Sequence, residues 1–232
     1  MTSIFRQYSG SVVFGAMLAA AVVLFWYSRS RTVVVIPDFS GPSEALAASA
    51  QQTAVFSGGC FWGVDAVFKH VKGVTRVTSG YSGGSAETAN YETVSTGMTG
   101  HAESVEVVYD PSQVSYAQLL KVFFSVAHDP TELNRQGPDV GSQYRSIIFY
   151  TNQQQHEIAE AYIKELNSQK VFSQPIVTQV MALNHFYPAE AYHQCYLEKH
   201  PKNPYIVFND QPKLGALQKQ FPDLYQEKPS AN

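Results

Sequence analysis

Cysteine is scarce in this sequence, and its scarcity excludes several kinds of protein. The 232 residues contain only Cys60 and Cys195, too few for a small fold held by disulfides or for a four-cysteine zinc site. The histidines near Cys195 do not follow a usual zinc-ligand spacing, so we predict no metal site. Two interpretations stay open: a reactive pair of thiols, or one reactive thiol and one buried, small apolar residue.

A strong excess of charge is also absent. The chain has 16 Lys and Arg against 19 Asp and Glu, a formal net charge of −3, and no basic cluster lies outside the N-terminal region. The sequence therefore lacks the electrostatic signature of a nucleic-acid partner. An apolar fraction of 44%, with 13% aromatic residues, is sufficient for one sizeable hydrophobic core.

Charge is missing altogether from residues 10–27. Residues 12–27 read VVFGAMLAAAVVLFWY, and the whole run makes a helix of about 27 Å, close to the hydrocarbon thickness of a bilayer. Trp26 and Tyr27 lie where an interfacial aromatic belt is expected. We therefore predict that residues 1–32 form an uncleaved, single-pass membrane anchor.

The alternative is a cleaved signal peptide. Small-residue cleavage patterns occur in residues 45–50 (ALAASA), but these lie about twenty residues beyond the apolar run, too far for ordinary processing. Basic residues flank both ends of the run, so the positive-inside rule does not decide its orientation. By analogy with other anchored domains, we expect the catalytic domain outside the cytoplasm. Residues 33–52, rich in Pro, Ser, Ala and Gly, are predicted to be a tether.

The rest of the chain, residues 53–232, is predicted to be one catalytic domain of the α+β class. Alternating apolar residues indicate strands, and apolar residues three or four apart indicate helices. The predicted order is strand 53–57, a helix after Cys60, strands 74–79 and 103–109, helix 115–127, strand 143–150, helix 152–166, strand 176–183 and a short helix 189–199. The β-α-β-β-α-β order predicts a ferredoxin-like, split βαβ two-layer sandwich with C-terminal additions.

Cys60 is the first candidate for chemistry. It follows Gly58-Gly59 between a predicted strand and a predicted helix, where backbone N–H groups and the helix dipole are expected to lower the thiol pKa from about 8.5. The alternative is a buried, inert cysteine at a strand–helix junction. The two glycines favour a nucleophile, because they permit another molecule to approach the backbone closely.

Phe61 and Trp62, which follow Cys60 directly, have two interpretations. Such a pair most often anchors packing, but beside a reactive thiol it could equally form an apolar wall for a methyl group. Glu103 also has two interpretations, because it is the first inward-facing residue of a strand whose other inward-facing residues are apolar. It is either a solvated charge at a strand end or a desolvated acid whose raised pKa lets it hold a proton near neutral pH.

Tyr91, Tyr144 and Asp139 complete the candidates. Either tyrosine could donate a hydrogen bond to a developing oxyanion, and either could be an ordinary half-buried tyrosine. Asp139 lies in a polar loop, where the ordinary role of an aspartate is to accept hydrogen bonds within a turn. The pattern alone leaves these alternatives open.

Longer blocks surround these residues. They are Gly58-Gly59-Cys60-Phe61-Trp62-Gly63, Gly80-Tyr81-Ser82-Gly83-Gly84, Asn90-Tyr91, Thr99-Gly100-His101-Ala102-Glu103, residues 136–146 (QGPDVGSQYRS) and residues 186–194 (FYPAEAYHQ). In sequence and in order they resemble the blocks of the A-type peptide methionine sulfoxide reductases. The resemblance spans residues 53–212, nearly all of the predicted domain.

The resemblance implies a function and a mechanism. Such enzymes reduce methionine S-sulfoxide, protein-bound or free, and so repair oxidised proteins. Cys60 would attack the sulfoxide sulfur and become a sulfenic acid, while Glu103 protonates the departing oxygen. The implied catalytic residues are Cys60, Glu103, Tyr91 and Tyr144, and the implied substrate-binding residues are Phe61, Trp62 and Asp139.

The resemblance also implies how the enzyme is recycled. No metal or organic cofactor is needed, because thiols such as thioredoxin supply the reducing equivalents. Many members carry resolving cysteines in a Gly-rich C-terminal segment, but residues 202–214 (KNPYIVFNDQPKL) contain none. Cys195 is the one candidate for a resolving residue, although its spacing from Tyr192 on the predicted last helix favours a buried structural role.

Two rival functions fit parts of the sequence. A papain-like cysteine peptidase would use Cys60 and Asn184-His185, but that family's Gly-Ser-Cys-Trp order and its Asn-Ser-Trp motif are absent. The non-enzymatic rival is an anchored module that binds peptides through the Gly-rich loop and its aromatic residues. Iodoacetamide reactivity of Cys60 separates an enzyme from a binding module, and methionine sulfoxide turnover separates a reductase from a peptidase.

Overall fold

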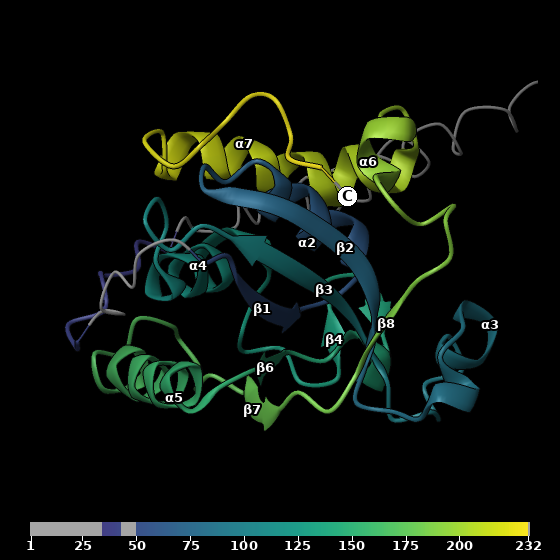
Figure 1. The fold of residues 1–232 in the computed structure, drawn as a ribbon, viewed down its shortest axis with the longest axis horizontal. Coiled ribbons are helices and arrows are strands. Elements are labelled where there is room, and N and C mark those ends of the chain that lie inside the picture. Colours follow the sequence, from purple (N-terminus) through teal and green to yellow (C-terminus); the bar gives the residue numbers. More distant parts are fainter. Residues whose placement is uncertain (1–33, 43–49, 232) are drawn as a thin grey trace, which may run out of the picture. The chain divides into compact units, whose positions relative to one another are not determined.

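A six-stranded sheet forms the centre of the protein (Figure 1), in a computed structural model that describes residues 34–42 and 50–231. The strands lie in the order β7-β6-β1-β3-β2-β8, and all neighbours are antiparallel except β6 and β7. Their bounds are β1 Gln52–Ser57, β2 Val74–Ser82, β3 Ala102–Tyr109, β6 Ile147–Tyr150, β7 Gln179–Ala182 and β8 Phe186–Pro188. A separate two-stranded ladder joins β4 (Arg135–Gln136) to β5 (Asp139–Val140).

Helices pack against this sheet and against one another. Helix α2 contacts β2, β3 and α7, and α5 contacts β6, β7 and α4, as the ribbon shows (Figure 1). The helix bounds are α2 Phe61–Lys69, α3 Tyr91–Val94, α4 Tyr116–Val122, α5 Gln153–Ser168, α6 Tyr196–Lys199 and α7 Gln211–Gln220. A π-helical turn, Phe123–Ala127, continues α4. The predicted mixed α+β class is confirmed.

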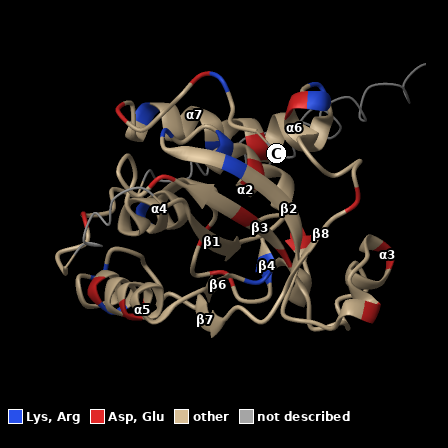
Figure 2. Cartoon of the chain, in the orientation of Figure 1, with Lys and Arg blue, Asp and Glu red and all other residues tan. Residues whose placement is uncertain are grey.

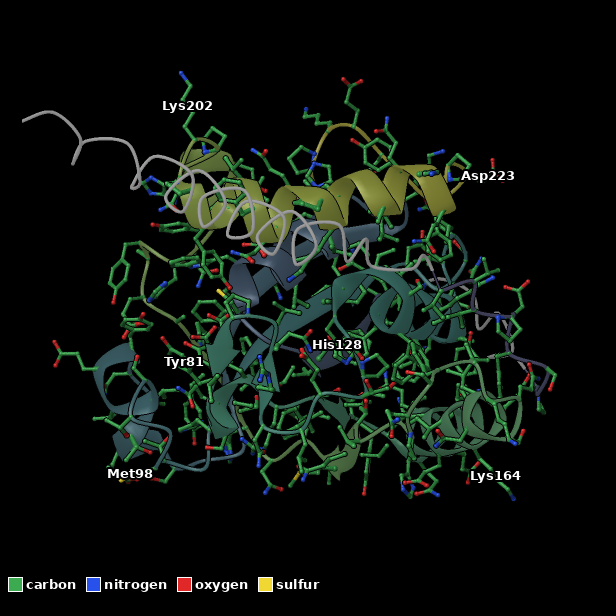
Figure 3. All side chains as sticks on the ribbon, turned by 180° about the vertical axis from the view of Figure 1, so that it is seen from behind. Tyr81, Met98, His128, Lys164, Lys202 and Asp223 are labelled. Atoms are coloured by element: carbon green, nitrogen blue, oxygen red, sulfur yellow. The ribbon has the colours of Figure 1, made fainter. Side chains whose placement is uncertain are left out.

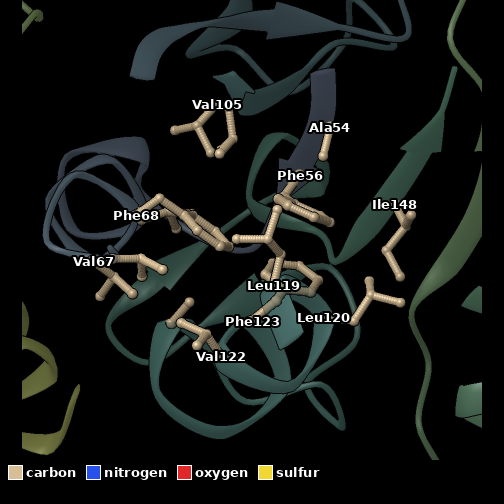
Figure 4. Close-up of a cluster of buried hydrophobic side chains, with 14 of the residues drawn as sticks. Ala54, Phe56, Val67, Phe68, Val105, Leu119, Leu120, Val122, Phe123 and Ile148 are labelled. Atoms are coloured by element: carbon tan, nitrogen blue, oxygen red, sulfur yellow. The ribbon is translucent and has the colours of Figure 1, made fainter. Parts of the chain in front are cut away.

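The core lies between the sheet and the helices α2 and α4. Ala54 and Phe56 of β1 belong to one buried cluster with Phe68 of α2 and Leu119 of α4 (Figure 4). The Phe56 ring stacks on the rings of Phe68 and Phe123, with centroids 5.0 Å apart in both pairs. All five side chains are essentially inaccessible to solvent. Because interiors of this kind are close-packed, strand β1 and helix α2 form a rigid support for the residues between them.

Two helix starts follow directly from the local sequence. The Ser115 side chain accepts the backbone N–H of Gln118, and the Gln118 side chain accepts the N–H of Ser115, which forms a capping box before α4. The Asn152 side chain accepts the N–H of Gln155 in the same way before α5. These caps satisfy N–H groups that have no partner within the helix.

The C-terminal third departs most from the predicted elements. The predicted strand 143–150 begins only at Ile147, because Ser142–Tyr144 form a 3-10 turn. The predicted helix 189–199 is reduced to α6, while β8 and α7 were not predicted. Strand β8 has three residues, too few for a visible alternation. Only Lys213 and Leu217 of α7 are buried, so this helix has no apolar stripe in its sequence.

Part of the predicted tether lies on the domain. Ile36 is 3% exposed, and Val34 and Phe39 pack against the core. The hydroxyl of Tyr162 donates a hydrogen bond to the carbonyl of Pro37 at 2.6 Å. The tether prediction followed the Pro, Ser and Gly content and gave no weight to these apolar side chains.

The predicted membrane anchor, residues 1–32 with its span at residues 10–27, lies outside the described residues. Within residues 34–42 and 50–231, no helix has the length and apolar character needed to cross a membrane. Lys and Arg are interspersed with Asp and Glu over the described ribbon (Figure 2).

Candidate active site

Cys60 lies at the N-cap of α2, directly after the central strand β1. The two glycines before it contact the protein's own core. A Cβ at Gly58 would lie 2.8 Å from Cγ of His128, and a Cβ at Gly59 would lie 2.7 Å from Cβ of Gln136. Gly59 also has a φ of +91°, which favours glycine. The glycines therefore let His128 and Gln136 pack beneath Cys60, rather than admitting another molecule as the sequence suggested.

His128 is a fixed, neutral support under this turn. It lies inside the molecule (Figure 3), with its Nδ1 2.9 Å from the carbonyl oxygen of Phe123 and its Nε2 2.7 Å from Oγ of Ser146. Burial lowers the pKa of His128 to about 4. The ring therefore carries no charge near neutral pH, and it does not stabilise a thiolate at Cys60.

Glu103 faces Cys60 from strand β3. Its Oε2 accepts the backbone N–H of Phe61 at 3.0 Å, one of the N–H groups that the first turn of α2 leaves unpaired. The carboxyl group also hydrogen bonds with the Cys60 thiol. Glu103 is 4% exposed, and burial raises its pKa to about 8. The carboxyl group therefore holds a proton at neutral pH, which favours the desolvated acid over the solvated strand-end charge.

The pKa of Cys60 is shifted in the direction opposite to the one predicted. Burial raises it well above its usual value and the charge of Glu103 raises it further, while a hydrogen bond from the backbone of Trp62 lowers it in part. The prediction of a lowered pKa is wrong because lost hydration outweighs the dipole of a helix of nine residues. Without substrate, Cys60 is a thiol rather than a thiolate.

The seven catalytic and substrate-binding residues predicted from the sequence all line one cavity of about 200 Å³. Burial raises the pKa of both Tyr91 and Tyr144, so both phenols keep their protons and can donate hydrogen bonds at physiological pH. The lining residues are Cys60, Phe61, Trp62, Tyr91, Glu103, Asp139, Tyr144 and Tyr205.

The indole of Trp62 is held by the segment that follows β8. It stacks on the Tyr196 ring, with centroids 3.6 Å apart and planes 4° apart, and its Nε1–H donates to Nδ1 of His193 at 3.1 Å. The His193 ring in turn contacts the rings of Phe61 and Tyr91, at centroid distances of 5.0 and 4.5 Å. His193 therefore holds the aromatic wall of the cavity in place, a structural role consistent with its lack of a zinc-ligand spacing in the sequence.

Tyr205 is the lining residue that the sequence analysis missed. Its hydroxyl donates a short hydrogen bond to Oδ2 of Asp139, and its ring meets Trp62 edge-on with centroids 5.9 Å apart. In the sequence, this segment was distinguished only by its lack of cysteine. The apolar residues 205–208 (YIVF) are the signal that could have indicated a buried contact there.

Cys195 does not occupy the position predicted for it. It precedes α6 with a left-handed backbone, φ 53°, and is half-buried. Its sulfur accepts a hydrogen bond from Nζ of Lys69 at 3.1 Å. It is not among the residues that line the cavity, and its expected place in the core is wrong because the predicted helix begins only after it, at Tyr196. Cys60 and Cys195 are both free thiols.

The cavity is arranged for one class of chemistry. A thiol beside a protonated carboxylic acid, with two phenol donors and an apolar wall, is suited to attack by sulfur on a group whose oxygen must take up a proton. His185, which a papain-like peptidase would need, is exposed and is not among the lining residues. In the described part of the chain, no group of three or more His, Cys, Asp or Glu side chains could hold a metal ion.

Comparison with known proteins defines the family. Residues 52–225 match the family model described as peptide methionine sulfoxide reductase. The chain is 58% identical over 186 residues to peptide methionine sulfoxide reductase MsrA 2 of Mesorhizobium japonicum, covering 80% of this chain and 95% of that protein. It is 50% identical over 206 residues to a protein of the same name from Synechocystis, covering 89% and 96%.

Solved structures agree with this result. Methionine sulfoxide reductase A of Corynebacterium diphtheriae is similar with a TM-score of 0.58 and 36% identity, covering 70% of this chain and 82% of that one. Mxr1 from Saccharomyces cerevisiae, in its reduced form, is similar with a TM-score of 0.60 and 31% identity, covering 66% and 87%. The chain belongs to the peptide methionine sulfoxide reductase family. It is an oxidoreductase that reduces methionine sulfoxide, and neither rival function is favoured.

Proposed function

We propose that Cys60 attacks the sulfur of methionine S-sulfoxide while Glu103 donates its proton to the sulfoxide oxygen. The sulfur–oxygen bond of the substrate breaks, and the oxygen is transferred to Cys60 as a sulfenic acid. The Cys60 sulfur is oxidised by two electrons and the substrate sulfur is reduced by two. Glu103 regains a proton from the thiol, so the carboxyl group ends the step in the state in which it began.

The single observation that carries this proposal is the protonated carboxyl group of Glu103 beside the thiol. Its pKa of about 8 keeps a proton available at neutral pH, and a positioned acid of this kind contributes about a hundredfold or more to a rate. The raised pKa of Cys60 fits the same scheme, because the thiol proton is released only as the acid gives up its own. Thiolate character would then develop during the reaction rather than before it.

The other lining residues position the substrate in this proposal. Tyr91 and Tyr144 donate hydrogen bonds to the sulfoxide oxygen as charge develops on it. The methyl group of the substrate packs against Phe61 and Trp62. Asp139, which accepts a hydrogen bond from the Tyr205 hydroxyl, helps to bind the substrate next to its sulfoxide group.

The test is turnover by the full-length chain with dithiothreitol as reductant. The separated S and R epimers of N-acetylmethionine sulfoxide serve as substrates, and we expect reduction of the S epimer alone. A single turnover without reductant should leave a sulfenic acid at Cys60 that dimedone traps. Absence of turnover with both epimers would refute the proposed reaction.

Recycling is proposed to use an external dithiol of the thioredoxin type. Two thiols reduce the sulfenic acid to a thiol and release one disulfide and one water. The proposal is supported by the lack of cysteine in residues 202–214 and by the contact that Cys195 makes with Lys69 outside the cavity lining. A thioredoxin whose second active-site cysteine is replaced should form a mixed disulfide with Cys60.

Two finer assignments are also proposals. The order β6-β1-β3-β2, with α2 and α4 as crossovers, supports a ferredoxin-like sandwich with β7, β8 and α7 as additions. The uncharged residues 10–27 support a single-pass anchor, and analogy with other anchored domains supports a catalytic domain outside the cytoplasm. Membrane fractionation and protease accessibility of the full-length chain test the anchor and its orientation.

A further inference from the structure

A buried ion pair lies behind the active site, and the reaction proposed above does not use it. Asp210 ends the π-helical turn Ile206–Asp210, and Lys213 belongs to the first turn of α7. Nζ of Lys213 is 3.2 Å from Oδ1 of Asp210, and the two side chains are 6% and 0% exposed. Charged side chains are rarely buried to this extent, because losing hydration is costly even for a pair. The position of the pair therefore calls for an explanation.

The pair packs directly on the helix that carries the nucleophile. A Cβ at Gly63 would clash with Oδ1 of Asp210 and would lie 2.7 Å from Nζ of Lys213. Gly63 is the third residue of α2, one turn of helix after Cys60. The absence of a side chain at this position is what lets the two charges approach the first turn of α2.

The two charges act on different groups in the cavity. Burial and then Glu103 are the main causes that raise the pKa of Cys60, and the charge of Asp210 raises it further. At Glu103, burial is again the main cause, and the charges of Asp139 and Asp210 add to the upward shift. At Asp139, burial raises the pKa, but the Tyr205 hydrogen bond and the charge of Lys213 oppose that shift.

We propose that the Asp210–Lys213 pair is a positioning element of the active site. It supports the first turn of α2 and biases the two carboxyl groups of the cavity toward opposite protonation states. Asp210 favours the protonated form of Glu103, which the reaction needs as an acid. Lys213 favours the ionised form of Asp139, which accepts a hydrogen bond from the Tyr205 hydroxyl. The inference rests on the proposed function, since it assigns the reason for a protonated Glu103.

The test is the pH dependence of two variants of the full-length chain, Asp210→Asn and the double variant Asp210→Asn with Lys213→Met. Sulfoxide reduction with dithiothreitol is measured against pH, together with the rate of iodoacetamide alkylation at Cys60, read by mass spectrometry. In both variants the alkaline limb of the activity profile should move to lower pH by about half a unit to one unit. Alkylation at pH 7.5 should become about three- to tenfold faster.

The double variant separates the two roles. Removing Lys213 as well should move the acidic limb to higher pH, because Asp139 then takes up a proton more readily. The single variant should not show this change. The double variant also guards against misfolding, since it leaves no unpaired charge in the interior, which is the costly outcome when only one partner of a buried ion pair is removed.

Exposed charges nearby provide the matched controls. Asp223→Asn and Lys219→Met change the same charges at exposed positions and should leave both profiles unchanged. Folded variants with an unmoved alkaline limb and unmoved alkylation rates would overturn the proposal, even if activity fell equally at every pH. Alkylation does not depend on turnover, so it tests the role of Asp210 even if the proposed reaction proved wrong.

Discussion

The two cysteines lie toward opposite ends of helix α2, Cys60 beside a neutral carboxylic acid and Cys195 beside a cation. Cys60 is at the N-terminal end, where its thiol meets the protonated carboxyl group of Glu103 in a cavity lined with aromatic rings. Cys195 contacts Lys69, the last residue of α2, whose ammonium group also pairs with Asp65 at 3.0 Å. The Cys60 thiol therefore lies beside an acid and a cavity that can hold a substrate. The Cys195 thiol lies beside a cation and does not line the cavity. The neighbours, rather than the residue type, separate a reacting cysteine from a structural one.

The charge of Lys69 is balanced by carboxyl groups rather than by the Cys195 sulfur. Burial works against the charge of Lys69, but the charges of Asp65 and Glu198, followed by the hydrogen bonds to Cys195 and Asp65, raise its pKa. Burial raises the pKa of Asp65 to about 7. Because two carboxyl groups already accompany one ammonium group, the ammonium group keeps charged partners even without the hydrogen bond to Cys195. We therefore expect the two ends of α2 to respond differently to mutation.

The largest effect is expected at the N-terminal end. Cys60→Ser should abolish sulfoxide reduction while the domain stays folded, because oxygen is a poor nucleophile toward sulfoxide sulfur. Activity with dithiothreitol and the circular dichroism spectrum are the measurements. Appreciable turnover by the folded serine variant would remove the distinction between the two cysteines.

The next largest effect is expected on stability, at the other end of the helix. Lys69→Met leaves Asp65 without its cation and should lower the free energy of unfolding by about 3 kcal/mol or more at pH 8. In the wild type Asp65 is ionised at pH 8 and becomes protonated below its pKa of about 7, and loss of Lys69, whose charge lowers that pKa, makes the ionised form still less favourable. Once Asp65 is protonated in both proteins, the missing cation costs little. The loss of stability should therefore shrink as the pH falls toward 5.

Urea unfolding at both pH values measures this change. The exposed Lys72→Met is the matched control, and it should lower stability far less. Activity per folded molecule should be unchanged in the Lys69 variant. A fall in activity without a fall in stability would show that the Lys69 cluster takes part in the reaction after all.

Glu103→Gln should slow the first chemical step by on the order of a hundredfold, the scale of a positioned acid. Wild-type activity should decline as the pH rises through about 8, because Glu103 then loses its proton. The glutamine variant should lack this limb, and its deficit should shrink at low pH as solvent supplies protons. Single-turnover rates from pH 5 to 9 provide the measurement. A rate within a few-fold of wild type at neutral pH would assign Glu103 to structure.

The smallest effect is expected for Cys195→Ala. Single-turnover activity and turnover with dithiothreitol should stay within about twofold of wild type, because Cys195 reaches neither the acid nor the cavity. Mass spectrometry after one turnover should show sulfenic acid at Cys60 in both proteins. A Cys60–Cys195 disulfide that forms rapidly and stoichiometrically would contradict this and make Cys195 the resolving residue.

Much of the domain was predictable because its signals are local. The capping residues Ser115 and Asn152 mark where α4 and α5 begin, and the order of the main strands and helices up to β6 follows from apolar periodicity. The C-terminal third was not predictable in this way. Strand β8 exists because the edge of β2 is available to pair with it, and α7 packs through few apolar residues of its own.

The sequence by itself determined which residues form the site. Seven of the eight side chains that line the cavity were predicted from motifs around Cys60, Glu103 and Asp139. Tertiary structure alone decided their protonation states and the contribution of Tyr205. The physical reason is that a pKa depends on burial and on charges from distant parts of the chain: Glu103 meets the amide of Phe61 across 42 residues of sequence, and desolvation reversed the pKa shift that the local helix dipole predicts for Cys60.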